Sequence, residues 1–418
     1  MRVLVASTGN DGHFGPLVPF ARACLAGGHQ VLVAAPESYA RSVSDAGLVH
    51  APFADAPADL IGPVMSRLPS MSFADADATV IREVFARIDA HAALPAITET
   101  IDRWRPDVVL REPAELGSLA AAEVAGVPHA QVAIGMQEML RTLLDLTVEP
   151  LAALAESVGL PQEQLSAAWR REPTFTTVPE QLDRAGDPGY REDLTLLRAT
   201  SWEPSAEAAG EPLPAWGDPS QPLLYVTFGS VAGSLPPFAG VFKEAIDGLA
   251  DLPVRVLMTV GRRLDVASLD PLPANVMVVP WWPQAQVLGH ASAILHHGGF
   301  GTTMGALHAG IPQAVAPLFT GDQAVNGRHV ASAGAGLTVE PGRDVVTRAL
   351  AVLPDILEDP VYLTGAREAA RQAQALPAMA TAVAHLEAMV RAAPLPGRSA
   401  RTYSASRGLR ALTSDFGG

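Results

Sequence analysis

Residues 1–35 read MRVLVASTGNDGHFGPLVPFARACLAGGHQVLVAA, and this stretch decides the fold class. Residues 3–6 and 30–34 are continuous apolar runs, which is typical of parallel strands buried on both faces. Between them, residues 17–25 place apolar side chains along one face of a helix, which a pair of glycines ends. Two strands joined by a helix within so short a span predict the βαβ unit of a doubly wound sheet.

The same alternation of strand and helix recurs along the chain and is interrupted once. Residues 203–222 are rich in proline and glutamate, have no period, and predict an interdomain linker. The sequence therefore predicts an α/β protein with two Rossmann-like doubly wound domains, residues 1–202 and 223–392, facing a central cleft. Residues 393–418 are expected to form a disordered tail. Further strands are predicted at residues 106–110, 127–132, 223–228, 254–260, 276–279, 293–295 and 313–316.

Composition excludes several classes of protein. Hydrophobic residues make up 48% and charged residues 17% of the 418 residues, which is enough for a large core. The net charge of -15 argues against a nucleic-acid partner. No apolar run approaches the roughly 20 residues of a membrane span, and the first apolar run is too short for a signal peptide. The single cysteine, Cys24, excludes intramolecular disulfides. We expect a cytoplasmic protein.

A glycine-rich turn in the second half offers a site for an anion. Residues 296–302 read HHGGFGT and lie between a predicted strand and a predicted helix. Unpaired N–H groups at a helix N-terminus lie at the positive end of the helix dipole, so they bind anions. A second glycine turn, Phe228-Gly229-Ser230, follows the first strand of the same domain. The pattern is no strict dinucleotide fingerprint, because Met304 stands where the third glycine is required.

His13 is a candidate general base. It follows the first predicted strand and precedes a helix, at the edge of the sheet where such folds bind ligands. The helix dipole disfavours a protonated imidazole there and keeps a neutral base available near pH 7. A purely structural histidine is the alternative that the sequence leaves open.

Four elements occur in order and together resemble a known signature. They are Trp281-Trp282-Pro283-Gln284, the HHGGFGT turn, Gly310-Ile311-Pro312-Gln313 and Asp322-Gln323. They closely resemble the donor-binding signature of nucleotide-sugar glycosyltransferases with the GT-B fold, and in particular the actinobacterial enzymes that decorate secondary metabolites. The resemblance reaches to about Ala392 and includes Gly12-His13 with Pro16. It implies an inverting transferase that uses a nucleotide-sugar as co-substrate and an apolar aglycone as acceptor.

The resemblance also implies roles for single residues. Trp281 would stack on the nucleobase, the backbone of Trp282 would read its edge, and His296 would contact the diphosphate. Asp322 and Gln323 would bind the donor sugar. The full set of implied donor contacts is Gly229, Ser230, Gly261, Trp281, Trp282, Gln284, His296, Gly298, Gly299, Gly301, Thr302, Asp322 and Gln323. Core packing is the alternative for the two tryptophans, and His297 is interpreted as structural.

By the same resemblance, His13 would deprotonate the acceptor and a carboxylate would orient it. The matching position is Glu112, where many relatives have the shorter Asp, and Glu115 is a weaker substitute. Plant relatives place a Glu that holds the ribose hydroxyls where this chain has Met304. Because a dTDP-sugar lacks the 2′-hydroxyl, a dTDP-deoxysugar donor is favoured over a UDP-hexose.

No metal or further cofactor is expected. The histidines near residue 296 fit no zinc spacing, and Asp75-Ala76-Asp77 is interpreted as part of a helix cap. An acceptor pocket is expected from Phe14, Met65, Phe73, Ile134 and Met136. Two rival functions stay open, a nucleotide-sugar 2-epimerase of the same fold and a non-catalytic auxiliary protein of a partner glycosyltransferase. Whether the chain forms a homodimer is also open.

Overall fold

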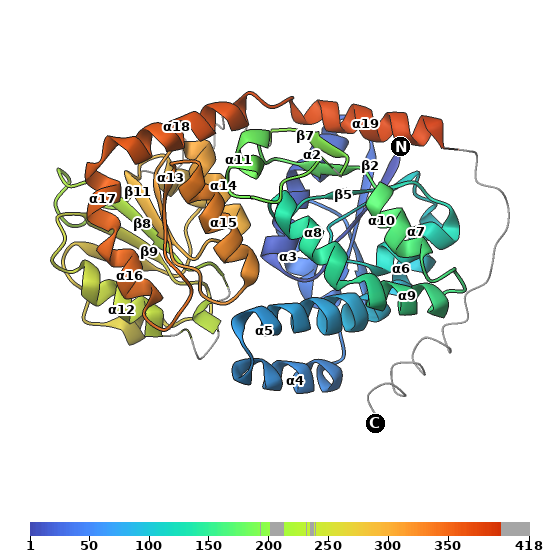
Figure 1. The fold of residues 1–418 in the computed structure, drawn as a ribbon, viewed down its shortest axis with the longest axis horizontal. Coiled ribbons are helices and arrows are strands. Elements are labelled where there is room, and N and C mark those ends of the chain that lie inside the picture. The colour runs from blue at the N-terminus through green and yellow to red at the C-terminus, as the bar shows by residue number, and fades with distance from the viewer. Residues whose placement is uncertain (193, 201–212, 231, 235–237, 239, 394–418) are drawn as a thin grey trace. The chain divides into compact units, whose positions relative to one another are not determined.

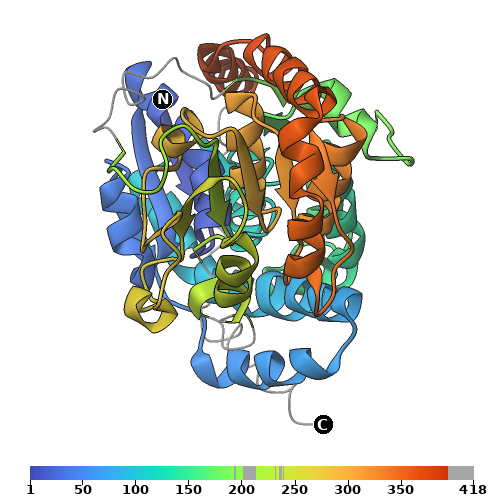
Figure 2. The ribbon, with the colours of Figure 1, turned by 90° about the vertical axis from the view of Figure 1, so that its left-hand side faces the viewer.

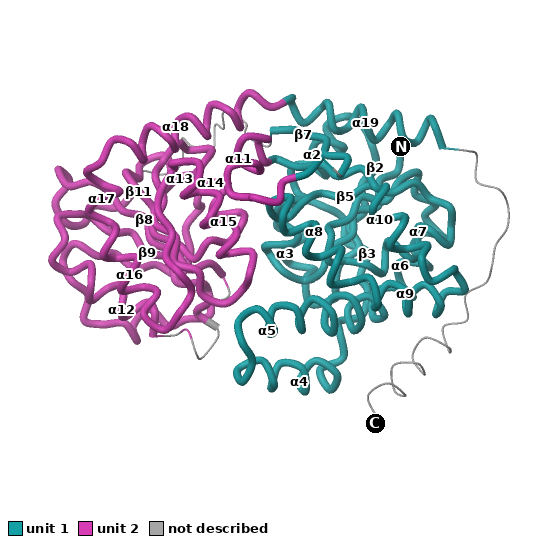
Figure 3. The backbone as a smooth tube through the Cα atoms, viewed as in Figure 1, with its two compact units in different colours: residues 1–177, 191–201, 377–418 teal, residues 178–190, 202–376 magenta. Residues whose placement is uncertain are grey.

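The computed structural model describes residues 1–192, 194–200, 213–230, 232–234, 238 and 240–393. The chain forms two compact units (Figure 3). Unit 1 comprises Met1–Thr177, Arg191–Ser201 and Pro377–Gly418, and unit 2 comprises Val178–Tyr190 and Trp202–Leu376. Each unit is a parallel sheet covered by helices, which Figures 1 and 2 show from two directions.

Unit 1 contains a seven-stranded parallel sheet in the order β3-β2-β1-β4-β5-β6-β7. Its core strands pair in register, with Val3 beside both Val31 and Val108. Alternate residues of β1 face opposite sides of the sheet. Leu4 packs against helices α6 and α7 on one side, and Val5 packs against α2 and α19 on the other. The strands are β1 (Arg2–Ala6), β2 (Gln30–Pro36), β3 (His50–Phe53), β4 (Val108–Arg111), β5 (His129–Val132), β6 (Thr174–Thr176) and β7 (Leu196–Arg198).

The helices of unit 1 include one unusual element, the π-helix η4 (Val80–Asp89), which lies between α5 and α6. A π-helix has wider turns than an α-helix and is rare, often marking a functional site. The α-helices are α1 (Asp11–Phe14), α2 (Val18–Ala26), α3 (Ala40–Asp45), α4 (Ala58–Arg67), α5 (Phe73–Thr79), α6 (Ala90–Trp104), α7 (Gly117–Ala125), α8 (Gln137–Leu146), α9 (Val148–Ser157), α10 (Gln164–Arg171) and α19 (Met379–Ala392).

Unit 2 contains a six-stranded parallel sheet in the order β10-β9-β8-β11-β12-β13. Helices α12, α16 and α17 cover one face, and α13 and α14 pack on the other. The strands are β8 (Leu223–Thr227), β9 (Arg255–Thr259), β10 (Val276–Val279), β11 (Ala293–His296), β12 (Gln313–Val315) and β13 (Gly336–Thr338). The helices are α11 (Glu180–Ala185), α12 (Gly240–Leu249), α13 (Gln284–Leu288), α14 (Phe300–Ala309), α15 (Gly321–Ser332), α16 (Val345–Ala351), α17 (Leu353–Glu358) and α18 (Pro360–Gln374).

The prediction of two doubly wound sheets is confirmed, and the strands that the apolar runs predicted are present within one or two residues of their expected bounds. Four strands were not predicted: β3, β6, β7 and β13. They have only three or four residues each and lie in the outer part of a sheet, where a short run carries little apolar periodicity.

The units differ from the predicted domains at two places. Helix α19 belongs to unit 1, because Ala382, Val383 and Leu386 pack into its core beside α2. Residues 178–190 belong to unit 2, where the Nδ1 atom of His329 lies 2.8 Å from the carbonyl oxygen of Leu182. Half of the predicted linker, residues 203–212, and nearly all of the predicted tail lie outside the described residues. No helix among the described residues is both long and apolar enough to cross a bilayer.

The strand order locates the ligand-binding edge of each sheet. In unit 1 the order reverses between β1 and β4, and in unit 2 between β8 and β11. Ligands of doubly wound sheets bind beyond the carboxyl ends of the strands at this reversal. The loop after β1 leads to His13, the loop after β4 begins with Glu112, and the turns after β8 and β11 contain Gly229 and Gly298.

Candidate active site

His13 and Glu112 lie together at the switch point of unit 1. The Nδ1 atom of His13 is 3.2 Å from Oε2 of Glu112. His13 lies inside α1 and not ahead of the helix, because Asn10 caps that helix by accepting a hydrogen bond from the Gly12 amide at 2.8 Å. The Glu112 side chain reaches the imidazole, and it can hold the tautomer with the proton on Nδ1, in which Nε2 is the basic nitrogen.

Glu112 is completely buried and is held ionised by its neighbours. Its oxygens accept hydrogen bonds from the Thr8 amide at 3.2 Å and from the Ala114 amide at 2.6 Å. Burial raises the pKa of Glu112, but His13 and the two amides outweigh it, so the pKa lies below its usual value. The carboxylate is thus a fixed negative charge beside His13. Glu115, the weaker candidate, instead accepts the Ser118 amide at 2.9 Å and caps α7.

Phe85 from the π-helix η4 packs against the ring of His13. The centroids of the two rings are 5.1 Å apart, with an angle of 54° between the planes. Phe85 follows helices α4 and α5, which the sequence associated with an acceptor pocket. The π-helix therefore brings an aromatic wall to the candidate base.

The five residues predicted to line an acceptor pocket do not share one environment. Phe14 is buried and packs edge-to-face on Tyr39, and Met136 is completely buried. Met65 is exposed, while Phe73 and Ile134 are half-buried. Phe14 and Met136 thus belong to the core, and Phe85 is the apolar side chain that the structure places against His13.

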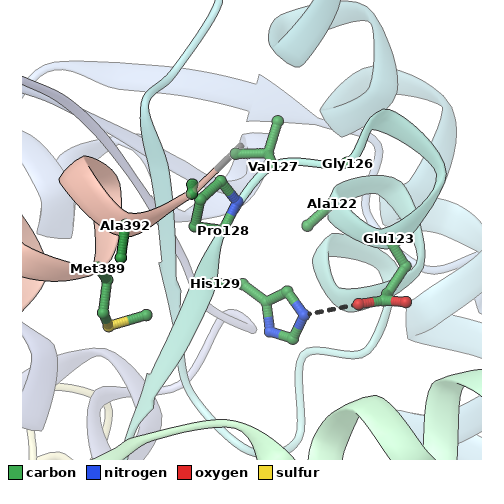
Figure 4. Close-up of a pocket in the computed structure, with 9 residues that line it drawn as sticks. Ala122, Glu123, Gly126, Val127, Pro128, His129, Met389 and Ala392 are labelled. Atoms are coloured by element: carbon green, nitrogen blue, oxygen red, sulfur yellow. Dashed lines mark hydrogen bonds and ion pairs between the residues drawn. The ribbon is translucent and has the colours of Figure 1, made fainter. Parts of the chain in front are cut away.

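A surface pocket of about 450 Å³ lies at the opposite edge of the same sheet (Figure 4). It begins where β5 begins, whereas His13 and Glu112 follow the ends of β1 and β4. His129 in this pocket lies between Glu123, at 3.0 Å, and Glu172, at 2.8 Å. The lining residues are Ala122, Glu123, Gly126, Val127, Pro128, His129, Met389, Ala392 and Ala393. The pocket is therefore separate from the candidate active site.

In unit 2, glycines follow three adjacent strands in the left-handed conformation. They are Gly229 after β8, Gly261 after β9 and Gly298 after β11, with φ between 80° and 89°. Only glycine adopts this conformation without strain, and it turns backbone amides toward the strand ends. A Cβ added to Gly261 would lie 3.3 Å from the carbonyl oxygen of Ser230, so these loops also touch one another. This is a suitable cradle for an anion.

His296 is part of the support for this cradle. It is completely buried at the end of β11. Its Nδ1 atom accepts a hydrogen bond from the Gly298 amide at 3.1 Å, and its Nε2 atom donates to Gln313 at 2.8 Å. Burial lowers the pKa of His296 to about 3, so the ring is neutral. Both ring nitrogens are engaged within the protein, which leaves neither for the diphosphate contact that the sequence suggested.

His297, interpreted from the sequence as structural, lies nearer to the glycine turns. A Cβ added to Gly229 would lie 2.8 Å from its Nε2 atom, and one added to Gly299 would lie 2.5 Å from the same atom. The ring stacks on Phe319, with centroids 6.0 Å apart. The Nε2 edge of His297 therefore lies between the two glycine turns. One signal in the sequence could have distinguished the two histidines. His297 follows the predicted strand and lies in the turn, whereas His296 belongs to the buried strand.

Helix α15 holds the turn after β11 from the other side. Asn326 donates to the carbonyl oxygen of Gly298 at 2.8 Å. The side-chain oxygen of Gln323 accepts from the amides of Leu318 and Phe319, at 2.8 and 3.1 Å. Asp322 lies in the first turn of α15 and is half-buried. The structure thus brings the glycine turn and the predicted sugar-binding residues together at one edge of the sheet.

Trp281 is an exposed side chain near the end of β10. The side chain is 53% exposed, and the guanidinium of Arg262 lies 4.6 Å from the centre of its ring. Core packing, the alternative role for Trp281, does not fit this exposure. Trp282 is half-buried and donates from its indole nitrogen to Gln286 at 3.2 Å.

The donor prediction rested on Met304, which the structure places in the interior. Met304 is 4% exposed in α14. The next residue, Gly305, faces Gln284, since an added Cβ would lie 3.8 Å from its side-chain oxygen. Neither position carries the carboxylate that would hold two ribose hydroxyls.

Residues 22–174 match the N-terminal domain, and residues 243–389 the C-terminal domain, of the family described as erythromycin biosynthesis protein CIII-like. The L-demethylnoviosyl transferase of Streptomyces niveus is 32% identical over 83% of this chain and 87% of its own length. The elloramycin glycosyltransferase of Streptomyces olivaceus is 31% identical over 92% of this chain and 97% of its own length.

A solved structure shares the whole architecture. The glycosyltransferase SsfS6 of Streptomyces sp. SF2575, solved in complex with thymidine diphosphate, has a TM-score of 0.71 and 25% identity. The alignment covers 93% of this chain and 99% of that one. The GT-B fold predicted from the sequence is therefore confirmed.

Proposed function

The chain belongs to the erythromycin biosynthesis protein CIII-like family and is a glycosyltransferase of the antibiotic-biosynthesis type. From this membership and from the site we propose the following reaction. It transfers a deoxysugar from a thymidine diphosphate donor to a hydroxyl group of an apolar aglycone, with inversion at the anomeric carbon. The observation that carries the proposal is the pair of His13 and Glu112, whose nearest atoms are 3.2 Å apart.

His13 acts as the general base. Its Nε2 atom takes the proton from the acceptor hydroxyl, and the oxygen forms a bond to the anomeric carbon as the bond to the nucleotide diphosphate breaks. Glu112 holds the imidazole in the required tautomer and stabilises the imidazolium that forms. Attack from the face opposite the leaving group in a single displacement gives inversion. Phe85 limits access of water to one face of the base.

In unit 2, backbone amides and His297 receive the leaving diphosphate. The turns at Gly229-Ser230 and at residues 298–301 present amides at the strand ends, and the Nε2 edge of His297 lies between them. Burial lowers the pKa of His297 to about 4, against the effect of a hydrogen bond with the backbone of Thr227, so the ring is neutral. His296 positions the turn and does not touch the ligand. These donors stabilise the developing charge without requiring a metal ion.

Trp281 stacks on the nucleobase, with the exposed ring as its support. Trp282 and Gln284 contact the nucleoside, and Asp322 and Gln323 bind the sugar. Thymidine is favoured over uridine because neither Met304 nor Gly305 supplies a carboxylate for a ribose 2′-hydroxyl. The thymidine diphosphate bound by SsfS6 supports this choice.

The test is calorimetric titration of the purified protein with dTDP and with UDP, each in the presence of EDTA. Tighter binding of dTDP without metal is expected, and incubation with a dTDP-deoxysugar and a polyketide aglycone should give a glycoside of inverted anomeric configuration by NMR. Preference for UDP would refute the donor. Retained configuration would refute the single displacement.

The two rival functions give different results in the same samples. A 2-epimerase would convert the donor sugar without any acceptor. A folded protein that binds neither nucleotide would be a non-catalytic auxiliary protein. His13 with its buried carboxylate favours the transferase, because an auxiliary protein has no need for an oriented base.

A further inference from the structure

Asp89 is the last residue of the π-helix η4, the element that contacts the candidate base. Phe85, four residues earlier on this helix, packs on the ring of His13. Ala90, the next residue, lies against the loop after β4, since a Cβ added to Gly117 would meet the Ala90 carbonyl oxygen at 2.7 Å and Oε1 of Glu115 at 2.9 Å. Asp89 is therefore flanked by residues that contact His13 on one side and the loop of Glu112 and Glu115 on the other.

The wide turn of the π-helix sets this placement. The amide of Ala90 is hydrogen-bonded to the carbonyl oxygens of Phe85 and Arg87, and the bond to Phe85 spans five residues. Asp89 is partly buried, and burial raises its pKa to about 7. The charged groups that act on it are His13 from α1 and Glu112 and Glu115 from the loop after β4. His13 favours its ionised form, and the two glutamates disfavour it.

We propose that Asp89 is a positioning residue for the transfer reaction, and that its carboxylate acts with Glu112 to set the basicity of His13. This inference rests on the proposed function of His13 as general base. Glu112 alone makes the contact that orients the ring. Asp89 adds a second negative charge, and this charge is present only when Asp89 is ionised.

The coupling between the two groups is reciprocal. His13 in its charged form favours ionised Asp89, so ionised Asp89 favours charged His13 by the same free energy. As the pH rises through neutrality, Asp89 loses its proton, and the negative charge that appears raises the pKa of His13. The proton that His13 takes from the acceptor is bound more tightly for the same reason. Loss of the charge at residue 89 should therefore give a weaker base that is deprotonated at a lower pH.

The test is the pH dependence of kcat/KM for wild type, Asp89→Asn and the control Asp102→Asn. Asp102 lies on the exposed face of α6, twelve positions beyond its first residue, and its substitution changes the net charge equally. Asp89→Asn should move the acid limb to lower pH by about one unit, because a nearby opposite charge shifts a pKa by about that amount or more. On the alkaline plateau its rate should fall by about two- to fivefold, since the base is weaker. Asp102→Asn should match wild type.

Two further measurements separate this role from a structural one. Asp89→Glu retains the charge and should keep the wild-type acid limb. The ring Cε1–H resonance of His13, assigned by its loss in His13→Gln, should titrate at lower pH in Asp89→Asn than in wild type. Unchanged titration of His13 and an unchanged acid limb would overturn the proposal. If no acceptor is glycosylated but the resonance moves, the function of the site fails while the coupling of Asp89 to His13 stands.

Discussion

Two histidines of unit 1 lie beside carboxylates, whereas two histidines of unit 2 are buried in the glycine turn after β11. In unit 1, His13 faces Glu112, and His129 lies between Glu123 and Glu172, which raise its pKa to about 9 against the effect of burial. In unit 2, burial is the dominant influence, and the pKa values of His296 and His297 fall to about 3 and about 4. His129 is thus prepared to hold a proton, whereas His296 and His297 stay neutral.

This difference matches the work proposed for each unit. A base that accepts a proton from a hydroxyl gains from a carboxylate beside it, because the imidazolium is stabilised as it forms. A group that meets a diphosphate only has to donate a hydrogen bond, and a buried neutral imidazole does this without a counter-charge. The predictions below test whether the two roles are as separate as the surroundings indicate.

The largest effect is expected for His13→Ala. Turnover should fall by about 10²- to 10⁴-fold, the range that general bases contribute, while the affinity for dTDP stays within about twofold of wild type. Initial rates with saturating donor and calorimetric titration with dTDP measure the two quantities. A matching loss of dTDP affinity would show that His13 serves the donor, and the contrast between the units would then be lost.

A smaller effect is expected in unit 2, where His297→Ala and His296→Ala should differ in kind. Loss of one hydrogen bond to a charged group costs about 1.5–3 kcal/mol, so His297→Ala should weaken dTDP binding by roughly 10- to 100-fold. Thymidine, which lacks the diphosphate, should bind both wild type and this variant equally. His296→Ala should mainly lower stability, by about 2–4 kcal/mol, because it opens a cavity and leaves Gln313 and the Gly298 amide without their partner.

Calorimetry with dTDP and thymidine, together with urea unfolding, measures these outcomes. If His297→Ala binds dTDP normally, the geometry around Gly229 and Gly299 has been misread. If His296→Ala is as stable as wild type but binds dTDP poorly, His296 is the ligand after all, as the sequence first suggested.

Much of the fold was predictable because its signals are local. Buried parallel strands are continuous apolar runs, and glycine turns after β8 and β11 necessarily meet at one edge of a parallel sheet. The pairing of His13 with Glu112 was expected from the family resemblance, and it agrees with the sheet, in which β1 and β4 are neighbours. The contact itself also depends on the length of a glutamate, which only the structure could measure.

Other features depend on contacts that no local pattern carries. The π-helix that brings Phe85 to His13 is set by packing of η4 against several helices. The sequence indicated His296 as the diphosphate contact, but the structure buries this last residue of β11 and gives both of its ring nitrogens partners, which is why His297 is proposed instead. Helix α19 carries an apolar face that could cover either unit, and only its contacts with α2 decide the matter.

The smallest effect expected is a difference in how pH affects stability. His129 has a pKa of about 9 in the folded protein and about 6.5 when unfolded, so its contribution is complete below pH 6.5 and is lost as the pH rises toward 9. His308 in α14 is the counterpart in unit 2, where burial lowers the pKa to about 4. Its contribution is present above pH 6.5 and is lost as the pH falls toward 4.

Urea unfolding from pH 5 to pH 9 should therefore separate His129→Gln from His308→Gln. The free energy of unfolding of His129→Gln should be about 1–3 kcal/mol below that of wild type at pH 6. The difference should shrink toward pH 9, because the contribution of His129 to the wild type disappears there. His308→Gln should instead gain relative to wild type as the pH falls below 6.5, since it removes a group that must be protonated on unfolding. The two difference curves should slope in opposite directions with pH and depart from their plateaus on opposite sides of pH 6.5. A constant offset for either variant would mean that the side chain acts by packing alone, and the electrostatic contrast between the units would not extend beyond the candidate site.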